Sequence, residues 1–424
     1  MLATALLSLP LLTLSPGLLA APPAAPSKPK SDGRAFLLNQ KPWQHDDGTI
    51  SWNGRTFPNW EAYRAAIPAT EWRCGTELAP IDDANGDIPY EGGIAGSTAD
   101  CTANFTNPAA EYDPSVETYC VQVVVHIIRN SSGSQGNVPI SRIQEQIDVL
   151  NRDFNALLGG SQTDVRIQFA LATVDPQGNP TEGYTLSNNT TWYNDGGSYW
   201  NSLAWDTNRY LNIYTNSAGG ALGYVPALPQ NGGLVGTNAD RVVCFWQAFG
   251  ENAAYAPFDM GRTVVHEVGH YLGLYHTFQS CGTASCYSTG DLVCDTNRQS
   301  SPNFGCGTQS TCGDGPDPTD NFMDYSDDPC MVRFSAEQAR RMRCTLLNWR
   351  PNLYTLCDNG GGGGGGGGGG NEPNPDLNND GKVNGVDLAT LLTNWGLSGA
   401  TGDVNNDGQI DGQDLAILLS GWTG

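Results

Sequence analysis

The spacing of apolar and polar positions along the chain predicts both strands and helices. The run VQVVVHII, residues 121–128, is apolar and rich in β-branched side chains, which indicates a buried strand that includes His126. The stretch Thr263–Leu274 is mostly apolar and contains no proline, so it is expected to form a helix. Gly273 can adopt a left-handed conformation and end that helix.

The two ends of the chain differ in composition from its middle. Residues 1–20 are apolar and end in small residues, which indicates a secretory signal, and the polar sequence that follows argues against a membrane anchor. No later stretch is long and apolar enough to be expected to span a bilayer. Gly360–Gly370 is an unbroken run of glycines, which cannot build a core and is expected to be a flexible tether.

Composition narrows the setting in which the protein works. The chain has 424 residues, enough for two or three domains, and its twelve cysteines fit an oxidising, extracellular environment. The formal net charge is −23, so neither nucleic acid nor an anionic membrane surface is an expected partner.

Three of the five histidines lie within the sequence HEVGHYLGLYH, which starts at His266. His266 and His270 are four residues apart, so a helix places both imidazoles on one face. After a turn, His276 can reach the same point, which gives a three-histidine zinc site with an open fourth position. Glu267 is then placed to take a proton from a bound water. The alternative, histidines that only decorate an amphipathic helix, leaves the full pattern unexplained.

A later segment, NFMDYSDDPC at Asn321–Cys330, matches the methionine turn that accompanies the extended histidine motif. Together with GDLVCDT, FSAEQARRMR and RIQEQIDVLNRDFN, these stretches resemble the metzincin endopeptidases and, among them, the pappalysin family, over residues 111–357. The resemblance implies that Met323 forms a hydrophobic floor under the zinc. It also implies that Tyr325 hydrogen-bonds the tetrahedral intermediate.

The fold expected from this resemblance is α/β, with a twisted, mostly parallel mixed sheet, two long helices above it and a disulfide-rich lower subdomain. The two helices would be Ile143–Leu157 and Arg262–Leu274. The expected layout is a signal peptide (1–20), a pro-segment (21–110), a metzincin catalytic domain (111–357), a poly-glycine linker (358–375) and a small all-α, dockerin-like domain (376–424).

The pro-segment contains a cysteine suited to silencing the enzyme. Cys74 lies in the sequence RCGT, which looks like the cysteine switch of the pappalysins, and its thiolate would fill the fourth zinc position in the latent form. A disulfide from Cys74 to another cysteine is the alternative. If Cys74 is the switch, one of the remaining eleven stays free, and Cys244, in an apolar strand, is the candidate.

The other cysteines are expected to form disulfides that together cross-link the region between the zinc helix and the methionine turn. Family resemblance suggests the pairs Cys281–Cys312 and Cys306–Cys330. Proximity in the chain suggests Cys286–Cys294, Cys101–Cys120 and Cys344–Cys357.

Two further assignments rest on the resemblance. The sequence TGDLVCDT is a candidate structural calcium site with Asp291, Asp295 and Thr296 as ligands, and a plain polar turn is an equal alternative. Asp328, five residues after Met323, matches an acidic position in the S1′ pocket of relatives that prefer Arg or Lys directly after the scissile bond. The alternative for Asp328 is a solvated loop residue or a calcium ligand.

The tail contains an internal repeat with a period of 27 residues. Each copy opens with an EF-hand-like loop whose expected calcium positions are Asp376, Asn378, Asp380, Lys382, Asn384 and Asp387, and then Asp403, Asn405, Asp407, Gln409, Asp411 and Asp414. Leu388, Leu391, Leu392 and Trp395 are spaced for one face of a short helix. The repeat resembles a dockerin, which implies two calcium ions, a fold that depends on them and a candidate cohesin-like receptor. Acidic surface loops without metal are the alternative.

These features predict a secreted zinc-dependent endopeptidase that is made as a latent proenzyme, holds one zinc ion and cleaves protein or peptide substrates. The tail would attach it to a cell surface or a complex. The alternative is a non-catalytic, dockerin-anchored binding protein on the same fold, which predicts damage at a zinc ligand or at Glu267, and the sequence shows none. Another class of zinc hydrolase would take its third ligand elsewhere, which the compact third histidine disfavours.

Overall fold

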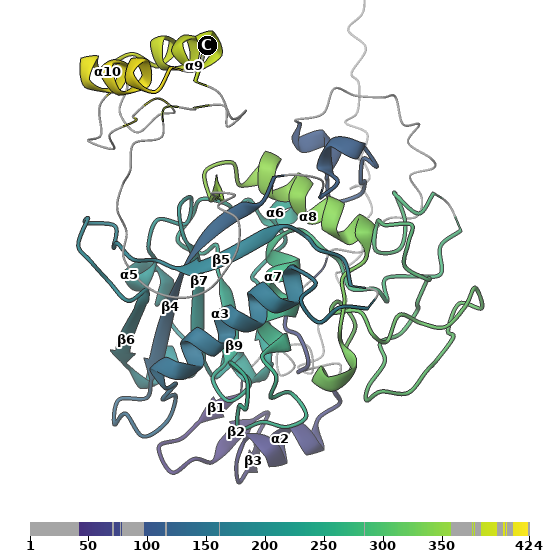
Figure 1. The fold of residues 1–424 in the computed structure, drawn as a ribbon. Helices are drawn as coiled ribbons and strands as arrows, with labels where there is room; N and C mark the ends of the chain where they lie inside the picture. Colours follow the sequence, from purple (N-terminus) through teal and green to yellow (C-terminus); the bar gives the residue numbers. More distant parts are fainter. Residues whose placement is uncertain are drawn as a thin grey trace, which may run out of the picture. The chain divides into compact units, whose positions relative to one another are not determined.

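The computed structural model describes residues 42–357, apart from positions 70, 71, 77, 79–96, 115, 116, 161 and 284, and parts of residues 375–422. The expected signal peptide and the glycine run lie outside the described residues. The chain forms two compact units, residues 1–358 and 359–424 (Figure 1). Within the described residues, none of the helices has the length and apolar character needed to cross a bilayer.

The first unit contains short and long strands interspersed with helices. Its strands are β1 (Trp43–Gln44), β2 (Ile50–Trp52), β3 (Arg55–Phe57), β4 (Tyr119–Arg129), β5 (Ile167–Leu171), β6 (Tyr184–Asn188), β7 (Leu211–Asn216), β8 (Gly223–Tyr224), β9 (Val242–Phe245) and β10 (Tyr354–Leu356). Its α-helices are α2 (Trp60–Ala66), α3 (Ile140–Phe154), α4 (Thr190–Tyr193), α5 (Trp200–Leu203), α6 (Pro229–Gly232), α7 (Arg262–Tyr271) and α8 (Ala336–Trp349).

A seven-stranded mixed sheet forms the centre of this unit, and β4 is its most connected strand. β4 pairs in parallel with β5, β6 and β7 and antiparallel with β10. The sheet continues through β9, which is parallel to β7, to the short strand β8, which is antiparallel to β9. The run of valine and isoleucine in β4 suits a strand that is covered on both faces. The predicted α/β class and mostly parallel sheet are confirmed.

Helices α3 and α7 contact each other and pack on the sheet through β5 and β9 (Figure 1). The buried residues of α3, among them Ile143, Ile147 and Leu150, follow helical spacing and enter the main core. Pro139 is the N-cap residue of α3, which therefore begins at Ile140. This start is three residues earlier than predicted. It also ends three residues early, because Ala156 adopts a left-handed backbone with φ of 55°.

Three of the five predicted disulfides are confirmed and two are wrong. Cys281–Cys312, Cys286–Cys294 and Cys306–Cys330 are present. In place of Cys101–Cys120 and Cys344–Cys357, the structure has Cys101–Cys344 and Cys120–Cys357. The reason is topological: β10 lies antiparallel beside the first residues of β4, and the segment that contains Cys101 packs on α8. Cys74 and Cys244 are free and buried, so the disulfide alternative for Cys74 is excluded.

Residues 42–78 form a small layer of their own, which we call the pro-module. β1, β2 and β3 make a separate three-stranded antiparallel sheet, and α2 follows it. Figure 1 shows these purple elements gathered at one end of the first unit. The pro-segment was predicted to end at residue 110. Residues 98–100 and 110–112 contact α8, and the Cys101–Cys344 disulfide ties this part of the chain to that helix.

The second unit contains two short helices, α9 (Gly385–Thr393) and α10 (Gly412–Ser420). They pack on a small core made of Val383, Leu391, Val404, Ile410 and Leu418. The expected apolar face of the first helix is therefore only half buried. Leu391 lies in the core, whereas Leu392 and Trp395 are 53% and 45% exposed, because a helix this short buries only one edge of the face.

His126 occupies the predicted place inside β4 and is fully buried. Its ring stacks on Tyr214 with centroids 4.5 Å apart. One ring nitrogen lies 2.7 Å from the Thr185 hydroxyl and the other 3.0 Å from Oδ1 of Asn212. Burial lowers the pKa of His126 to about 4, which keeps the ring neutral at the pH values where the fold is stable.

This lowered pKa predicts an acid-sensitive contribution to stability. Between pH 6.5 and 4 the unfolded chain binds the His126 proton and the folded chain does not. The contribution, about 3 kcal/mol, is complete above pH 6.5 and is lost as the pH falls toward 4. Urea unfolding of the Glu267→Ala proenzyme should therefore vary less steeply with pH, by nearly one proton, when His126→Gln is added. His45→Gln, at an exposed histidine, is the matched control, and identical slopes in all three proteins would contradict the prediction.

Candidate active site

Helix α7 carries Glu267 and two of the three motif histidines, and all ten of its residues are buried. The helix ends at Tyr271 because Gly273 has a φ of +88°, a left-handed conformation that favours glycine. The backbone N–H of Leu274 donates to the carbonyl of Gly269 at 3.0 Å and closes the turn. This turn reverses the chain, so that the third histidine, His276, returns to the helix.

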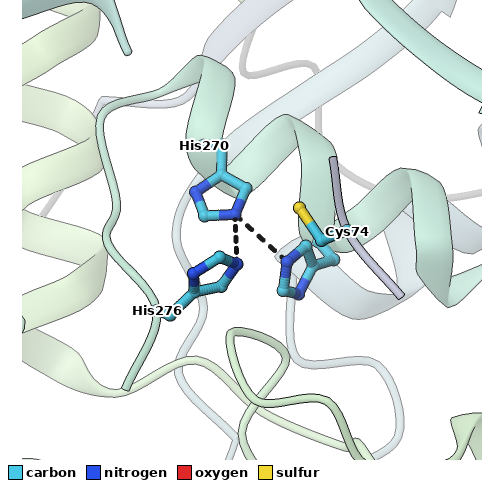
Figure 2. Close-up of side chains that lie close together, drawn as sticks. Cys74, His270 and His276 are labelled. Carbon is cyan, nitrogen blue, oxygen red and sulfur yellow. Dashed lines mark hydrogen bonds between the residues drawn. The ribbon is translucent and has the colours of Figure 1, made fainter. Parts of the chain in front are cut away.

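The three imidazoles meet at one point (Figure 2). Nε2 of His270 lies 3.1 Å from Nε2 of His266 and 3.0 Å from Nε2 of His276. Nδ1 of His266 is 2.7 Å from the carbonyl oxygen of Phe322, and Nδ1 of His270 is 2.8 Å from that of Leu274. A carbonyl oxygen only accepts, so in both rings Nδ1 carries the proton and Nε2 presents a lone pair.

Lone pairs that face one another at this distance repel unless a cation lies between them, and the donor set fits zinc. In a tetrahedral site with Zn–N bonds of about 2.0–2.1 Å, ligand nitrogens are about 3.3–3.4 Å apart, close to the spacing seen here. Burial lowers the pKa of His270 to about 4. Burial, together with the neighbouring histidines, also holds the pKa values of His266 and His276 well below the usual range. All three rings are therefore neutral, the form that binds metal.

Cys74 supplies a fourth donor to the same point. Its Sγ and one nitrogen of each of His266, His270 and His276 all lie within 4.8 Å of one another, and all four residues are buried. Figure 2 shows Cys74 beside the labelled imidazoles of His270 and His276. A closed set of one thiol and three imidazoles is a ligand combination that zinc accepts.

The backbone around Cys74 is held against the edge strand β8. The N–H of Leu222 donates to the carbonyl of Trp72 at 2.8 Å, and the N–H of Gly75 donates to the carbonyl of Gly223 at 2.9 Å. The pro-module thus adds a short extended segment to the sheet edge directly above α7, and these hydrogen bonds set the position of the thiol.

Glu267 lies at the metal cluster and is fully buried. Its Oε2 accepts from the Thr76 hydroxyl at 3.2 Å and from the Cys74 thiol at 3.6 Å. Burial raises the pKa of Glu267 to about 8. Its Oε1 has no hydrogen-bond partner among the described residues. A carboxyl group with a perturbed pKa and a spare oxygen beside metal ligands is suited to general acid–base chemistry.

The methionine turn passes directly beneath the zinc helix. Met323 is buried, and a Cβ added to Gly269 would lie 2.5 Å from its sulfur, so the glycine allows the turn to approach α7 closely. Two residues later, the ring of Tyr325 lies 4.9 Å from that of His276 and 5.9 Å from that of His266. Burial raises the pKa of Tyr325 well above its usual value, so its hydroxyl stays protonated and can donate.

Sequence reasoning missed Asp324, which holds the methionine turn in shape. This buried carboxylate accepts from the side chain and backbone of Asn303 at 2.7 and 3.1 Å. It also accepts from Gln299 at 3.2 Å and from Ser326 at 3.1 Å. Its place between Met323 and Tyr325 was the only available signal, because Gln299 and Asn303 come from a distant loop.

Asp328 is fully buried, which rules out a solvated loop residue. One carboxylate oxygen, Oδ2, accepts from the backbone N–H groups of Met260 and Arg262 at the start of α7, at 3.0 and 3.4 Å. The other, Oδ1, lies 3.7 Å from the guanidinium of Arg73, the residue before Cys74. Burial raises the pKa of Asp328, and the charge of Arg73 opposes that effect.

Two of the three candidate calcium ligands of the lower subdomain bond each other, and the third has other partners. The Thr296 hydroxyl donates to Asp291 at 2.8 Å, and burial raises the pKa of Asp291 to about 7. Asp295 accepts from the Ser335 hydroxyl at 2.6 Å and from the backbone N–H of Glu337 at 2.9 Å, so it caps α8. A calcium ion at this place stays a prediction.

Only part of the predicted calcium positions of the tail can be located. Asn384, Asp387, Asp411 and Asp414 are described and form matching caps at the starts of α9 and α10. In both copies, the last loop position also accepts from the backbone N–H ten residues earlier, at 2.8 Å in the first and 2.7 Å in the second. The other predicted positions lie outside the described residues: Asp376, Asn378, Asp380, Lys382, Asp403, Asn405, Asp407 and Gln409.

Comparison with known proteins finds relatives for both units. Residues 197–347 match the family described as pregnancy-associated plasma protein-A, and residues 374–420 match the dockerin type I domain. The chain is 33% identical over 293 residues to an extracellular metalloprotease of Pyricularia oryzae, which covers 66% of this chain and 90% of that protein. Extracellular metalloprotease 1 of Coccidioides posadasii is 34% identical over 290 residues, covering 66% and 96%. Mature mirolysin from Tannerella forsythia, solved with a cleaved peptide, is 33% identical, covers 56% of this chain and 96% of its own, and has a TM-score of 0.48.

The buried histidine cluster, the adjacent glutamate and the methionine turn, taken with the family match and the two extracellular metalloproteases, define a zinc metalloendopeptidase of the metzincin type. The chain belongs to the pappalysin family, and it carries a dockerin type I domain near its C-terminus. The predicted family and enzyme class are confirmed, and a non-catalytic binding protein is not favoured.

Proposed function

We propose that His266, His270 and His276 hold one catalytic zinc ion, that Glu267 is the general base and that Cys74 closes the site in the latent form. The convergence of three neutral imidazoles and one thiol at a single buried point supports this assignment most directly. Met323 is assigned as the floor of the site because of its close approach to α7.

When bound, zinc would polarise the scissile carbonyl and lower the pKa of a water toward about 7. Glu267 takes a proton from the attacking water and passes it to the leaving amine. Tyr325, whose phenol stays protonated, donates a hydrogen bond to the carbonyl oxygen as negative charge develops on it. The carbonyls of Phe322 and Leu274 keep two of the imidazoles in the required tautomer and orientation.

The pocket that holds Arg73 supports a preference for a basic residue directly after the scissile bond. The guanidinium donates to the carbonyl of Ser326 at 3.2 Å, lies 4.3 Å above the ring of Phe258 and faces the spare oxygen of Asp328. A buried carboxylate without a cation is costly, so the same place should select arginine or lysine from a substrate once Arg73 has left.

The disulfide between Cys101 and Cys344 bears on where the latent form is cut. This disulfide retains the segment that follows Ser97, whereas the pro-module before Leu78 blocks the cleft. The activating cut is therefore assigned between these two residues. The sequence has no lysine or arginine between Arg73 and Arg129, so an enzyme that prefers basic residues cannot cut itself efficiently there. Another protease, or a slow cut outside the preference, is required.

The N-terminal apolar stretch and the tail suggest where the enzyme works. The proposed signal peptide would direct secretion, and the dockerin domain, with two calcium ions bound, would attach the enzyme to a cohesin-like receptor on a surface or in a complex. The glycine run between the two units would serve as the tether.

The zinc and base assignments are tested together by metal content and activity. The wild-type protein should contain one zinc, and His270→Ala should lose most of it. Glu267→Ala should keep the metal and lose peptidase activity by roughly 10²- to 10⁴-fold, the usual contribution of a general base. Metal analysis and peptide hydrolysis measure both. A Glu267→Ala protein that lacks zinc or cuts at the normal rate would show that the role is misassigned.

Specificity is tested by substitution of the pocket carboxylate. Asp328→Asn in the activated enzyme should reduce kcat/KM for peptides with arginine after the cut by roughly 10- to 100-fold, because a charged hydrogen bond is lost. Peptides with an apolar residue there should be affected much less. Asp327→Asn, at the neighbouring half-buried carboxylate, is the matched control.

The N-terminus of the secreted protein checks the same assignment independently. Wild type and Glu267→Ala, each expressed alone, should both remain uncut between Leu78 and Ser97. Efficient cleavage there in the wild type only would show that the basic preference or the pocket is misassigned.

The tail is predicted to need calcium in order to fold. Its core is small, and two of the expected calcium ligands, Asp387 and Asp414, are fully buried. Circular dichroism of the full-length Glu267→Ala protein and of a form ending at Asp358, each titrated with calcium after chelation, isolates the contribution of the tail. A helical signal that does not change with calcium in the full-length protein would contradict this prediction.

A further inference from the structure

The pro-module has secondary structure of its own, and its contacts with the rest of the first unit extend well beyond Cys74. β1, β2 and β3 pair with one another, and within the described residues none of them joins the seven-stranded sheet. Helix α2 begins with an Asn59 cap, whose side chain accepts from the N–H of Ala62 at 2.8 Å. The module therefore has its own sheet, helix and cap, and its apolar side chains pack against the rest of the first unit.

That surface is apolar and aromatic. The buried side chains that the module contributes to a common core are Ile50, Phe57, Trp60, Tyr63, Ile67 and Trp72. Trp60 meets Phe245 of β9 at a ring distance of 5.9 Å, and Trp72 meets Phe258 at 5.9 Å. Large aromatic side chains in well-packed pockets carry most of the binding energy in protein interfaces.

Arg64 is the charged centre of this interface. It is 3% exposed, and its guanidinium lies 4.0 Å from the ring centre of Phe245 and 4.6 Å from that of Tyr255. It donates to the carbonyl of Ala221 at 3.1 Å. Two aromatic rings and one carbonyl of the catalytic domain thus contact the guanidinium of Arg64. Arg64 makes these contacts only while the module is docked.

Gln44 makes a second set of polar contacts with the rest of the enzyme. The backbone N–H of Gln44 donates to Oδ1 of Asn194 at 2.7 Å, and the Asn194 amide donates back to the Gln44 carbonyl at 3.0 Å. The Tyr193 hydroxyl donates to the side-chain oxygen of Gln44 at 2.5 Å. These bonds fix the orientation of the module without any part played by the metal site.

The module has no covalent bond to the rest of the enzyme other than the chain itself. Cys74 is the only cysteine before Cys101, and it is free. A cut between Leu78 and Ser97 therefore leaves the aromatic interface, the Arg64 site and the Gln44 contacts unchanged. Before the cut, the tethered module is present at an effective concentration on the order of millimolar. After the cut, its binding to the enzyme becomes bimolecular.

We propose that the pro-module, residues 42–78, remains docked after the chain is cut and acts as a separate inhibitory subunit. This rests on the proposed latency of the uncut form. The partner that fits the surface formed by Ala221, Phe245, Tyr255 and Phe258 is the cleaved module. Activation then requires a second event, either dilution or destruction of the module, and cleavage alone leaves the enzyme latent.

The test uses the full-length chain with a recognition sequence for an unrelated protease inserted between Leu78 and Ser97. In the Glu267→Ala background, which cannot digest itself, the two fragments should co-elute on size exclusion at micromolar concentration after the cut. In the active background, the cut protein should show less than roughly a tenth of its full activity at micromolar concentration, and specific activity should rise on serial dilution. Fragments that separate, with full activity at once, would overturn the proposal.

Substitutions separate docking by the module from ligation by the thiol. Trp60→Ala with Arg64→Ala should release the cut module and raise activity at micromolar concentration by at least tenfold, roughly the effect of losing one interface anchor. Glu61→Ala, on the exposed face of the same helix, is the matched control and should not release it.

Cys74→Ala should still co-elute after the cut, and its release would overturn the proposal by showing that the thiol alone holds the module. If every form lacks peptidase activity, the proposed function fails while co-elution still decides the docking.

Discussion

The complete burial of helix α7 is the constraint on which the rest of the structure depends. Ten consecutive buried residues include an arginine, a glutamate and two histidines, and each polar group needs a partner. Carbonyls hold the histidine Nδ1 atoms, Asp153 lies 3.3 Å from the guanidinium of Arg262, and the methionine turn closes the lower side. The groups of α7 that remain without a partner among the described residues include the Nε2 atoms of His266 and His270 and one carboxyl oxygen of Glu267, and a metal ion and a reacting water would satisfy them.

The latent form meets that demand with groups from its own N-terminal region. Cys74 faces the imidazoles, Thr76 donates to Glu267, and Arg73 faces the carboxylate of Asp328. Three nearly consecutive residues thus contact the proposed metal position, the proposed general base and the proposed specificity carboxylate. Under this assignment, latency is a matter of satisfying the same buried groups that a substrate would satisfy.

Local patterns were predicted well from the sequence, and long-range pairings were not. The zinc helix could be predicted because the spacing of His266 and His270 fixes their common face once a helix forms. The pairing of Cys101 with Cys344 spans 243 residues and depends on how one segment wraps α8, which no local pattern records. Asp324 was missed for the same reason, since its main partner, Asn303, lies on another loop. Periodicity also indicated which residues of α9 share a face, but it does not record how much of that face is covered.

Under the proposed assignment, Asp328 couples the geometry of α7 to the choice of substrate. One of its oxygens holds the backbone N–H groups at the start of α7, where a negative charge is favoured, and the other faces the pocket. A change of this residue that alters the pocket also removes an anchor of the helix that positions His266 and Glu267. A neutral isostere such as asparagine keeps one acceptor for the helix, whereas an apolar residue keeps none. In the proposed pocket, specificity is therefore most readily changed from the walls, such as Phe258, because those side chains do not also hold α7.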